Sequence, residues 1–320
     1  VTAVQPGSAA ANAGIRMGWL IEQIDDHALG DVLAEIQRGD NPAQQRIAML
    51  RLEGALAARL EPSERARAVT LALRDSAGKP HRINLIPQPA AGTRVEIPLL
   101  PPMLFNIEHR RISQTDGGCI GLIHFNVWMP ALAQGFPAAL DAVRDCRGLI
   151  IDLRGNPGGV IGTAMGVGGW LVDKPTPLGH VNAGGSTARL PALPRRVSDD
   201  GRLIAPYAAP LAILIDGRSA STSEVFTSGM QQAGRARVFG SRSAGMALPS
   251  LMHPLPNGDD LLYAIADLTA PDGTRLEGIG ITPDQPSAPT LAGLAAGRDQ
   301  PLDAAIGWLQ TTSTPAKKED

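Results

Sequence analysis

A serine-rich turn that follows an apolar run is the first segment of this sequence whose residues could do chemistry. Residues 217–224 read GRSASTSE and follow the stretch Leu211–Ile215, which predicts a buried strand leading into a helix. A serine at such a junction places its hydroxyl at the carboxyl edge of a sheet, where free amides of the helix N-terminus can stabilise an oxyanion. The pair Ser221 and Glu224 also matches a capping box, which has no catalytic role. From this segment alone both interpretations stand.

A second segment combines a buried strand with a glycine-rich turn. Residues 150–159 read IIDLRGNPGG, and glycines there let the backbone approach a ligand closely and offer amide donors. A phosphate-binding loop would end in Gly-Lys-Ser or Gly-Lys-Thr, which is missing. The alternative is an ordinary strand-to-helix turn in which Arg154 pairs locally with Asp152.

Together the two segments resemble the C-terminal processing (tail-specific) serine protease family, which includes the tricorn protease core and the interphotoreceptor retinoid-binding repeats. The resemblance rests on Asp-Leu-Arg-x-Asn-Pro-Gly-Gly, on the later Ser-Ala-Ser-x-Ser-Glu, and on residues 232–240 and 276–284. It covers about residues 116–310 and implies an α/β fold, a crotonase/ClpP-like ββα spiral core preceded by a truncated PDZ-like domain. It also implies that Ser221 is the nucleophile and that no cofactor is needed.

The residue that would activate the serine decides which branch of the family the sequence resembles. Most members use a lysine in a Gly-Lys-Gly segment, but Met246 occupies that position here and Gln232 replaces a supporting aspartate. A thioether cannot accept a proton at a useful pKa, so this dyad is unavailable. The lysines of the chain all lie elsewhere, at Lys79, Lys174, Lys317 and Lys318.

The tricorn-like branch uses a histidine on an early core strand, and His124 interrupts the apolar stretch Cys119–Val127. An imidazole is costly there unless it is hydrogen-bonded, so a satisfied core histidine is the alternative. Because the lysine is missing, we expect His124 to be the general base, since imidazoles exchange protons near neutral pH. Glu277 is the candidate acceptor that orients its ring, and otherwise it is a surface carboxylate. Ile123 stands where the tricorn-like arrangement has a serine, and His253 is a distant backup base.

The oxyanion donors that we expect are the amide of Thr222 and an amide of Gly158 or Gly159. The predicted function is hydrolysis of peptide bonds in protein substrates by a Ser-His-Glu triad through an acyl-enzyme. Two other interpretations remain open. One is a catalytically degenerate binding protein on the same fold, and the other is a crotonase-type acyl-CoA enzyme. No group of His, Cys and Asp has metal-ligand spacing, so no metal is expected.

The elements that must position these residues divide the chain into four parts. Residues 1–90 are expected to form a PDZ-like domain, because the run Val4–Asp25 resembles the second half of PDZ domains in bacterial serine proteases. Its usual first strand would precede the start of this sequence, and a helical insertion at about 32–66 interrupts it. The other expected parts are a proline-rich connector (91–115), a protease core of alternating strands and helices (116–310) and a mobile tail (311–320).

Composition and charge exclude several classes of protein. The 320 residues give room for about two domains, and 43% hydrophobic against 19% charged residues allows a buried core. A formal net charge of −2 and only 3% aromatic residues argue against nucleic-acid binding. No apolar run reaches the ~18 residues that would suggest a membrane span.

The two cysteines, Cys119 and Cys146, are too few for a disulfide framework or a four-cysteine zinc site. Either one bridge or two buried thiols is compatible with their spacing. The compartment follows only from the resemblance, which favours the bacterial cell envelope, the periplasm or secretion. Oligomeric state does not follow from the sequence.

Overall fold

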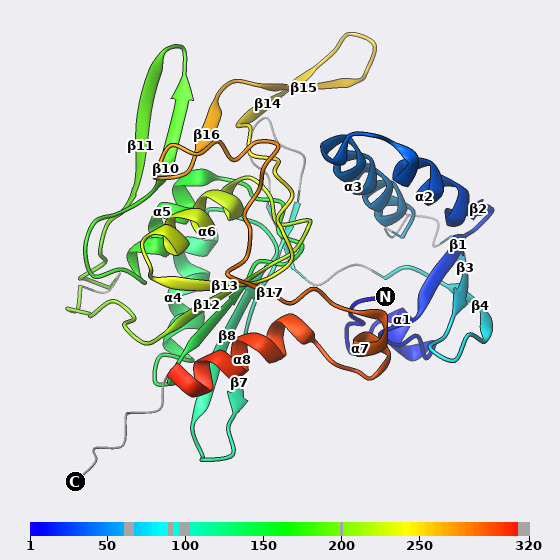
Figure 1. Ribbon diagram of the computed structural model, residues 1–320, viewed down its shortest axis with the longest axis horizontal. Coiled ribbons are helices and arrows are strands. Elements are labelled where there is room, and N and C mark those ends of the chain that lie inside the picture. Colours follow the sequence, from blue (N-terminus) through cyan, green and yellow to red (C-terminus); the bar gives the residue numbers. More distant parts are fainter. Residues whose placement is uncertain (61–66, 89–91, 96–102, 199–200, 313–320) are drawn as a thin grey trace. The chain divides into compact units, whose positions relative to one another are not determined.

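The computed structural model describes residues 1–320 except 61–66, 89–91, 96–102, 199–200 and 313–320 (Figure 1). The chain divides into two compact units, Val1–Ala91 with Pro289–Gln300, and Gly92–Ala288 with Pro301–Asp320. Residues 289–300 therefore lie with the first unit, although the sequence places them in the protease core. All the site residues predicted above belong to the second unit.

The first unit is built around a four-stranded antiparallel sheet in the order β2-β1-β3-β4. Its core comes from strict alternation in β3, where Val69, Leu71 and Leu73 are buried. Two helices, the first of which begins at Leu29, cover most of the helical segment expected at 32–66, of which 61–66 lies outside the described residues. The PDZ-like assignment of this unit stays a prediction. The elements are α1 (Ala9–Asn12), β1 (Leu20–Ile24), β2 (His27–Ala28), α2 (Leu29–Arg38), α3 (Pro42–Arg59), β3 (Val69–Arg74), β4 (Pro80–Leu85) and α7 (Leu291–Ala295).

The second unit is organised by a six-stranded sheet in the order β17-β13-β12-β9-β8-β7. All its neighbouring strands run parallel except β7, which pairs antiparallel with β8. Because parallel strands end at one edge, the segments that follow β8, β9 and β12 meet there. The strands are β7 (Ile107–Ser113), β8 (Cys119–Phe125), β9 (Leu149–Asp152), β12 (Leu211–Ile215), β13 (Ala236–Gly240) and β17 (Gln285–Pro286).

Helices cover both faces of this sheet, which explains why its central strands are continuous apolar runs. On one face, α4 (Leu132–Asp141), α5 (Ile161–Gly169) and α6 (Thr222–Gln232) share a core with odd-numbered residues of β8, β9 and β12, such as Ile123. On the other face, α8 (Gln300–Thr312) packs on even-numbered residues of these three strands, such as Leu122 (Figure 1). The helix predicted after the serine motif is therefore present as α6. None of the described helices is long and apolar enough to cross a bilayer.

Smaller sheets complete the second unit. Strands β10 (Thr176–Ala183), β11 (Ser186–Ala192) and β16 (Asp267–Thr269) form one, and β14 (Ser250–Pro254) pairs with β15 (Asp260–Ala264). The stretch 91–115 was expected to be a connector, but its described residues contain β5 (Thr93–Val95), β6 (Met103–Phe105) and most of β7. Strand β7 is an edge strand with mostly exposed side chains, so its letters lack the apolar pattern by which buried strands are recognised.

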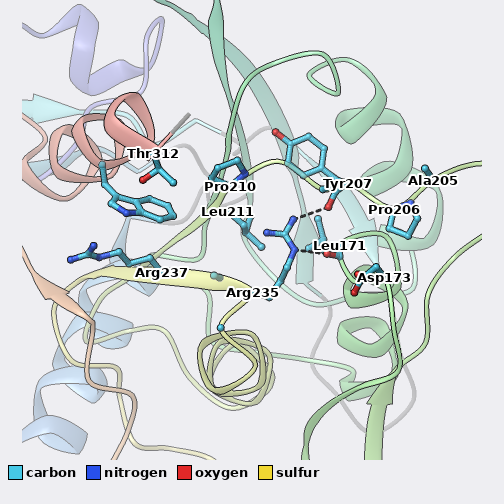
Figure 2. Close-up of a pocket in the computed structure, with 14 residues that line it drawn as sticks. Leu171, Asp173, Ala205, Pro206, Tyr207, Pro210, Leu211, Arg235, Arg237 and Thr312 are labelled. Carbon is cyan, nitrogen blue, oxygen red and sulfur yellow. Dashed lines mark hydrogen bonds between the residues drawn. The ribbon is translucent and has the colours of Figure 1, made fainter. Parts of the chain in front are cut away.

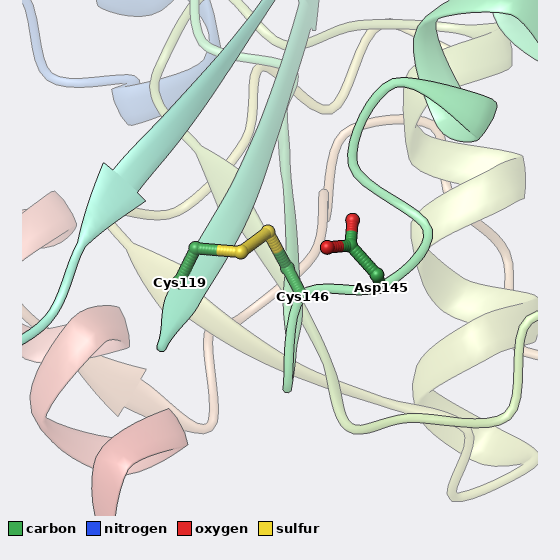
Figure 3. Close-up of side chains that lie close together, drawn as sticks. All are labelled: Cys119, Asp145 and Cys146. Carbon is green, nitrogen blue, oxygen red and sulfur yellow. A yellow bond between two sulfur atoms is a disulfide. The ribbon is translucent and has the colours of Figure 1, made fainter. Parts of the chain in front are cut away.

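The two cysteines form a disulfide that joins the start of β8 to the loop before β9 (Figure 3). Asp145 lies beside Cys119 and Cys146, with the three potential ligand atoms within 4.8 Å of one another. Both sulfurs are bonded to each other, so they offer no thiolate to a metal ion. Asp145 forms a two-point ion pair with Arg111 at 2.5 and 2.7 Å, and this pair lowers the pKa of Asp145 to about 2.

Candidate active site

Ser221 lies at the turn from β12 into α6, where the sequence predicts a nucleophile. It is the N-cap residue of α6 and is half-buried, with φ of 53° and ψ of −116°. Among the described non-glycine residues only Asp25 shares a positive φ. Such backbone conformations are strained for any residue with a Cβ, and they cluster at active sites. A comparable sharp strand-to-helix turn exposes the nucleophile in α/β-hydrolases.

Backbone hydrogen bonds hold the strained turn in place. The Ser221 amide donates to the Met246 carbonyl and to Glu224 Oε2, both at 2.9 Å. Met246, which stands at the position of the family's lysine, therefore borders Ser221 directly. Its side chain is 39% exposed. The structure thus brings the substituted position to the serine and provides no amine there.

Glu224 is the centre of a buried network behind the serine. Its carboxylate, 1% exposed, accepts hydrogen bonds from Ser243 Oγ at 2.6 Å, and from the amides of Gly245, Ser221 and Met246 at 2.7, 2.9 and 3.1 Å. Burial raises the pKa of the Glu224 carboxyl above its ordinary value, and these hydrogen bonds act in the opposite direction. The capping interaction and the nucleophile position are compatible, because the same carboxylate that caps α6 also fixes the serine amide.

The glycine-rich turn after β9 lies against the serine turn. A Cβ added to Gly158 would lie 2.7 Å from Ser221 Cβ and 3.0 Å from the Thr222 nitrogen. Thr222 Oγ1 also donates to the Gly159 carbonyl at 2.8 Å. The φ values of Gly158 and Gly159, +101° and +136°, are accessible mainly to glycine, so this close contact depends on both residues. The two segments that the sequence singled out therefore meet in one place.

The predicted oxyanion donors differ in whether their amides are free. The Gly158 amide donates to Asn156 Oδ1 at 2.9 Å. Within the described part of the chain, the amides of Gly159 and Thr222 have no hydrogen-bond acceptor. Gly159 is exposed, and Thr222 begins α6, where helix amides point outward. Gly159 and Thr222 can thus bind an oxyanion, and the amide of Gly158 is already engaged.

Asn156 is an important residue to which the sequence analysis gave no role. Its buried side chain donates to the Phe125 carbonyl at 2.9 Å, and its own carbonyl accepts from the Ala220 amide and Ser223 Oγ, both at 3.1 Å. It therefore joins the end of β8, the glycine-rich turn and the serine turn. The only signal for it in the sequence is its place in the Asn-Pro-Gly-Gly segment.

His124 lies near the carboxyl end of β8 and is half-buried. Its Nδ1 is 3.0 Å from the Asp152 carbonyl oxygen. Because a carbonyl only accepts, Nδ1 carries the proton, and Nε2 of the neutral ring is left as an acceptor. Strand alternation places His124 on the sheet face of Leu122, which α8 covers, and not on the face that α6 covers. No hydrogen bond between described residues joins it to Ser221 or Glu277.

Glu277 lies on the serine side of the site. Its Oε2 accepts from the Ala247 amide at 2.6 Å, and the next residue, Gly278, donates to the Gly245 carbonyl at 2.9 Å. Segment 245–247 therefore connects Glu277 to the serine turn. The proposed backup base, His253, is on the exposed strand β14. Asp152 forms the predicted local ion pair with Arg154, at 2.6 Å.

A cavity of about 670 Å³ lies at the other edge of the sheet, where β12 and β13 begin (Figure 2). Arg235 donates there to the carbonyls of Leu171 and Tyr207, at 2.6 and 2.7 Å. The Arg235 guanidinium thus holds together the two loops that contain these carbonyls. Burial lowers the pKa of Arg235 below its ordinary value. Because Ser221 follows the opposite end of β12, this cavity is separate from the candidate site.

Comparisons with known proteins assign the chain to a family. The model for peptidase family S41 matches residues 119–287, just over half of the chain. The chain belongs to peptidase family S41. This S41 member is 31% identical over 138 residues to a "Probable CtpA-like serine protease" of Staphylococcus haemolyticus, and 30% identical over 180 residues to one of Staphylococcus aureus. The alignments cover 43% and 56% of this chain but only 27% and 35% of those relatives.

Two solved structures share the fold of this S41 member. The photosystem II D1 C-terminal processing protease has a TM-score of 0.54 and 19% identity, covering 92% of this chain and 71% of that one. Mature CPAF complexed with lactacystin has a TM-score of 0.60 and 15% identity, covering 97% and 78%. The predicted α/β fold of the family is confirmed.

Proposed function

We propose that this S41 member is a serine-type endopeptidase that hydrolyses protein substrates with Ser221 as nucleophile. The observation that carries the proposal is the strained backbone of Ser221 beside the amides of Gly159 and Thr222, which have no acceptor among the described residues. A positioned hydroxyl with two donors for the developing oxyanion is what acyl transfer requires.

In the proposed reaction, Ser221 Oγ attacks the peptide carbonyl while His124 Nε2 accepts its proton. The tetrahedral oxyanion binds the amides of Gly159 and Thr222. His124 then gives the proton to the departing amine, which leaves an acyl-enzyme. A water molecule, deprotonated by the same imidazole, hydrolyses the ester and restores the Ser221 hydroxyl. No cofactor takes part in these steps.

The proposal includes Glu277 as the third member of the catalytic group. In the structure the Asp152 carbonyl orients His124, and Glu277 accepts from Ala247. The triad therefore requires His124 to exchange the carbonyl for the Glu277 carboxylate when substrate binds. Segment 245–247 supports this role, because it ties Glu277 to the serine turn through the bonds described above.

A second candidate function is binding without hydrolysis on the same fold. The observation that favours it is the placement of His124, which is bonded to a backbone carbonyl on the face opposite α6, together with a methionine at the lysine position. A protein of this kind would keep the pocket and the oxyanion donors but would turn over no peptide.

Covalent labelling separates the two candidates. The purified chain is treated with a fluorophosphonate probe, and the modified residue is located by mass spectrometry. Hydrolysis of casein and of a peptide library is measured in parallel, with Ser221→Ala as the control. Labelling at Ser221, and loss of at least about 10⁴-fold of the hydrolysis in the variant, would support the peptidase. A wild-type chain that neither labels nor hydrolyses would support the binding protein.

We also propose that the protein acts in the bacterial cell envelope, in the periplasm or outside the cell, on protein segments that are unfolded or have an exposed C-terminus. The Cys119–Cys146 disulfide supports this location, because disulfides persist in oxidising compartments. Alkylation of the protein under native expression, before lysis, tests it. The expected result is no free thiol, whereas two alkylated cysteines would contradict the location.

A further inference from the structure

The cavity at the edge of the sheet where β12 and β13 begin has the size and the wall of a small-molecule site (Figure 2). Its volume is about 670 Å³, and ligand pockets commonly measure about 300–1,000 Å³. The wall combines residues 171–173 and 205–211 with the start of β13 and the end of α8, all within the second unit. Apolar side chains form much of it, among them Leu171, Pro206, Pro210 and Trp308. Such a wall favours an organic molecule over a bare inorganic ion.

Arg237 brings a positive charge to this wall without a protein partner. Its side chain is half-buried, and its guanidinium carbon lies 5.8 Å from the ring centres of both Phe239 and Trp308. Within the described part of the chain the Arg237 guanidinium forms no hydrogen bond and no ion pair, and its Nε is buried. By contrast, Arg111 has the two-point ion pair with Asp145. The two rings hold the Arg237 side chain at the cation–π distance, and its Nη donors are left for an anion that enters the cavity.

The other ionisable groups of the wall do not compensate the charge of Arg237. Asp173 lines the cavity, and its negative charge favours the charged form of Arg235, although burial lowers the pKa of Arg235 overall. Burial raises the pKa of Tyr207 to about 12, so this phenol is neutral at physiological pH, and it donates to the Cys146 carbonyl at 3.1 Å. Within the described residues the lining thus carries two guanidinium groups against one carboxylate, which fits a ligand with one negative charge.

We propose that this cavity binds a small organic carboxylate with an apolar body, held by the Arg237 guanidinium and by the apolar wall. A carboxylate suits the site because a guanidinium can donate two parallel hydrogen bonds to its two oxygens. The site goes beyond the proposed peptidase function and does not depend on it. Ser221 follows the opposite end of β12, and neither Gly159 nor Thr222 lines the cavity. A bound carboxylate should therefore leave the serine turn accessible.

Isothermal titration calorimetry of the full chain with phenylbutyrate and with octanoate tests the proposal. Phenylbutyramide keeps the apolar body without the carboxylate, and inorganic phosphate supplies an anion without an apolar body. Arg237→Met removes the charge and keeps a long apolar side chain against the rings. The matched control is Arg195→Met, because the Arg195 guanidinium also lies over a tryptophan ring, 5.3 Å from the centre of Trp170, and does not line this cavity.

We expect at least one of the two carboxylates to bind the wild type and Arg195→Met with the same Kd, and Arg237→Met at least about tenfold more weakly. Phenylbutyramide and phosphate should bind the wild type at least about tenfold more weakly than that carboxylate does. The rate of fluorophosphonate labelling at Ser221 should be the same with and without the carboxylate. If Arg237→Met does not fold, Arg237→Lys compared with Arg195→Lys gives the same contrast in smaller size, because lysine keeps the charge and loses the two-point contact.

Several outcomes would overturn the inference. A wild type that binds neither carboxylate at millimolar concentration removes the site, and so does an Arg237→Met variant with the wild-type Kd. An amide that binds as tightly as its acid removes the anion from the assignment. A carboxylate that slows labelling of Ser221 would lie at the candidate active site and not in this cavity. None of these results contradicts the proposed peptidase function, which fails only if the wild type neither labels nor hydrolyses peptides.

Discussion

The serine turn leads into α6 on one face of the sheet, whereas the His124 side chain lies on the other face, and the two differ in how completely they are fixed. On the α6 face, the Ser221 amide has two acceptors, Glu224 has four donors and Gly158 touches the turn. On the α8 face, the His124 ring has one hydrogen bond among the described residues, to a backbone carbonyl.

This difference indicates which part of the site would have to rearrange for the proposed reaction. Donors that already point at the oxyanion need no rearrangement during the reaction, so the nucleophile side can act as it stands. A base that must change its hydrogen-bond partner adds its own barrier to the chemical step. The recruitment of His124, and not the stabilisation of the oxyanion, is then the step on which the proposed activity depends.

The largest effect on the rate is expected from removing the His124 imidazole. In His124→Ala we expect kcat for peptide hydrolysis to fall by about 10⁴, because the serine loses its proton acceptor. Steady-state kinetics on a peptide substrate measure this loss.

His180→Ala is the matched control for this variant. His180 is also half-buried on a strand, β10, and its Nδ1 also lies near a backbone carbonyl, that of Ala270 at 3.3 Å. It should keep the wild-type kcat. Equal losses in both variants would show that His124 matters only for packing, and an unchanged rate in His124→Ala would remove it as the base.

A substitution at Gly158 disturbs the firmly held serine turn. A methyl group on Gly158 would lie 2.7 Å from Ser221 Cβ, and the φ of +101° is itself unfavourable for alanine. Gly158→Ala should therefore displace the oxyanion donors and lower kcat by about 10³. Labelling by the fluorophosphonate should slow in parallel.

Gly258→Ala separates this steric effect from backbone strain. Gly258 has a φ of +88°, and an added Cβ there meets nothing within 4 Å. We expect it to lower the melting temperature slightly and leave kcat unchanged. A Gly158→Ala variant with wild-type kcat would mean that the glycine-rich turn does not hold the oxyanion.

The sequence predicts the serine side better than the histidine side for a physical reason. The strand, turn and helix around Ser221 are contiguous, so local letters such as those of the capping box specify them. The face on which His124 lies depends on alternation, and alternation is invisible in β8 because both faces of that strand are buried. The hydrogen-bond partner of His124 is a backbone carbonyl on the neighbouring strand, and a backbone group cannot be recognised from residue types.

The same reasoning explains which parts of the fold could be predicted. The α/β class and the helix α6 follow from local periodicity and from the motifs. The edge strand β7 does not, because its exposed residues lack the apolar pattern, and the disulfide does not, because spacing does not determine whether Cys119 and Cys146 meet. The role of Asn156 depends on contacts among three segments distant in the sequence.

A smaller effect sharpens the role of Glu277. In Glu277→Gln the amide oxygen can still accept from Ala247, and the Asp152 carbonyl can still orient His124. What is lost is the negative charge that would stabilise the imidazolium. We therefore expect kcat to fall by about 10² with KM little changed. Wild-type kinetics in Glu277→Gln would mean that this residue only holds segment 245–247 in place. A change in KM with kcat unchanged would also exclude its role in stabilising the imidazolium.

The smallest effect on rate is expected from the disulfide, which joins the opposite end of the histidine strand. Cys119 begins β8, whereas His124 is near its carboxyl end, so removing the bridge should leave the base in place. The bridge closes a loop with a sequence separation of 27, for which chain entropy predicts a contribution of about 3.5 kcal/mol to the free energy of unfolding. Denaturant unfolding of the Cys119→Ser, Cys146→Ser double variant should show this loss, with kcat unchanged at a temperature where the protein is folded. A reductant should lower the denaturant midpoint of the wild type and leave that of the double variant unchanged. A large fall in kcat in the folded variant would show instead that β8 transmits the constraint to His124, and that this histidine is held more firmly than its hydrogen bond to the Asp152 carbonyl indicates.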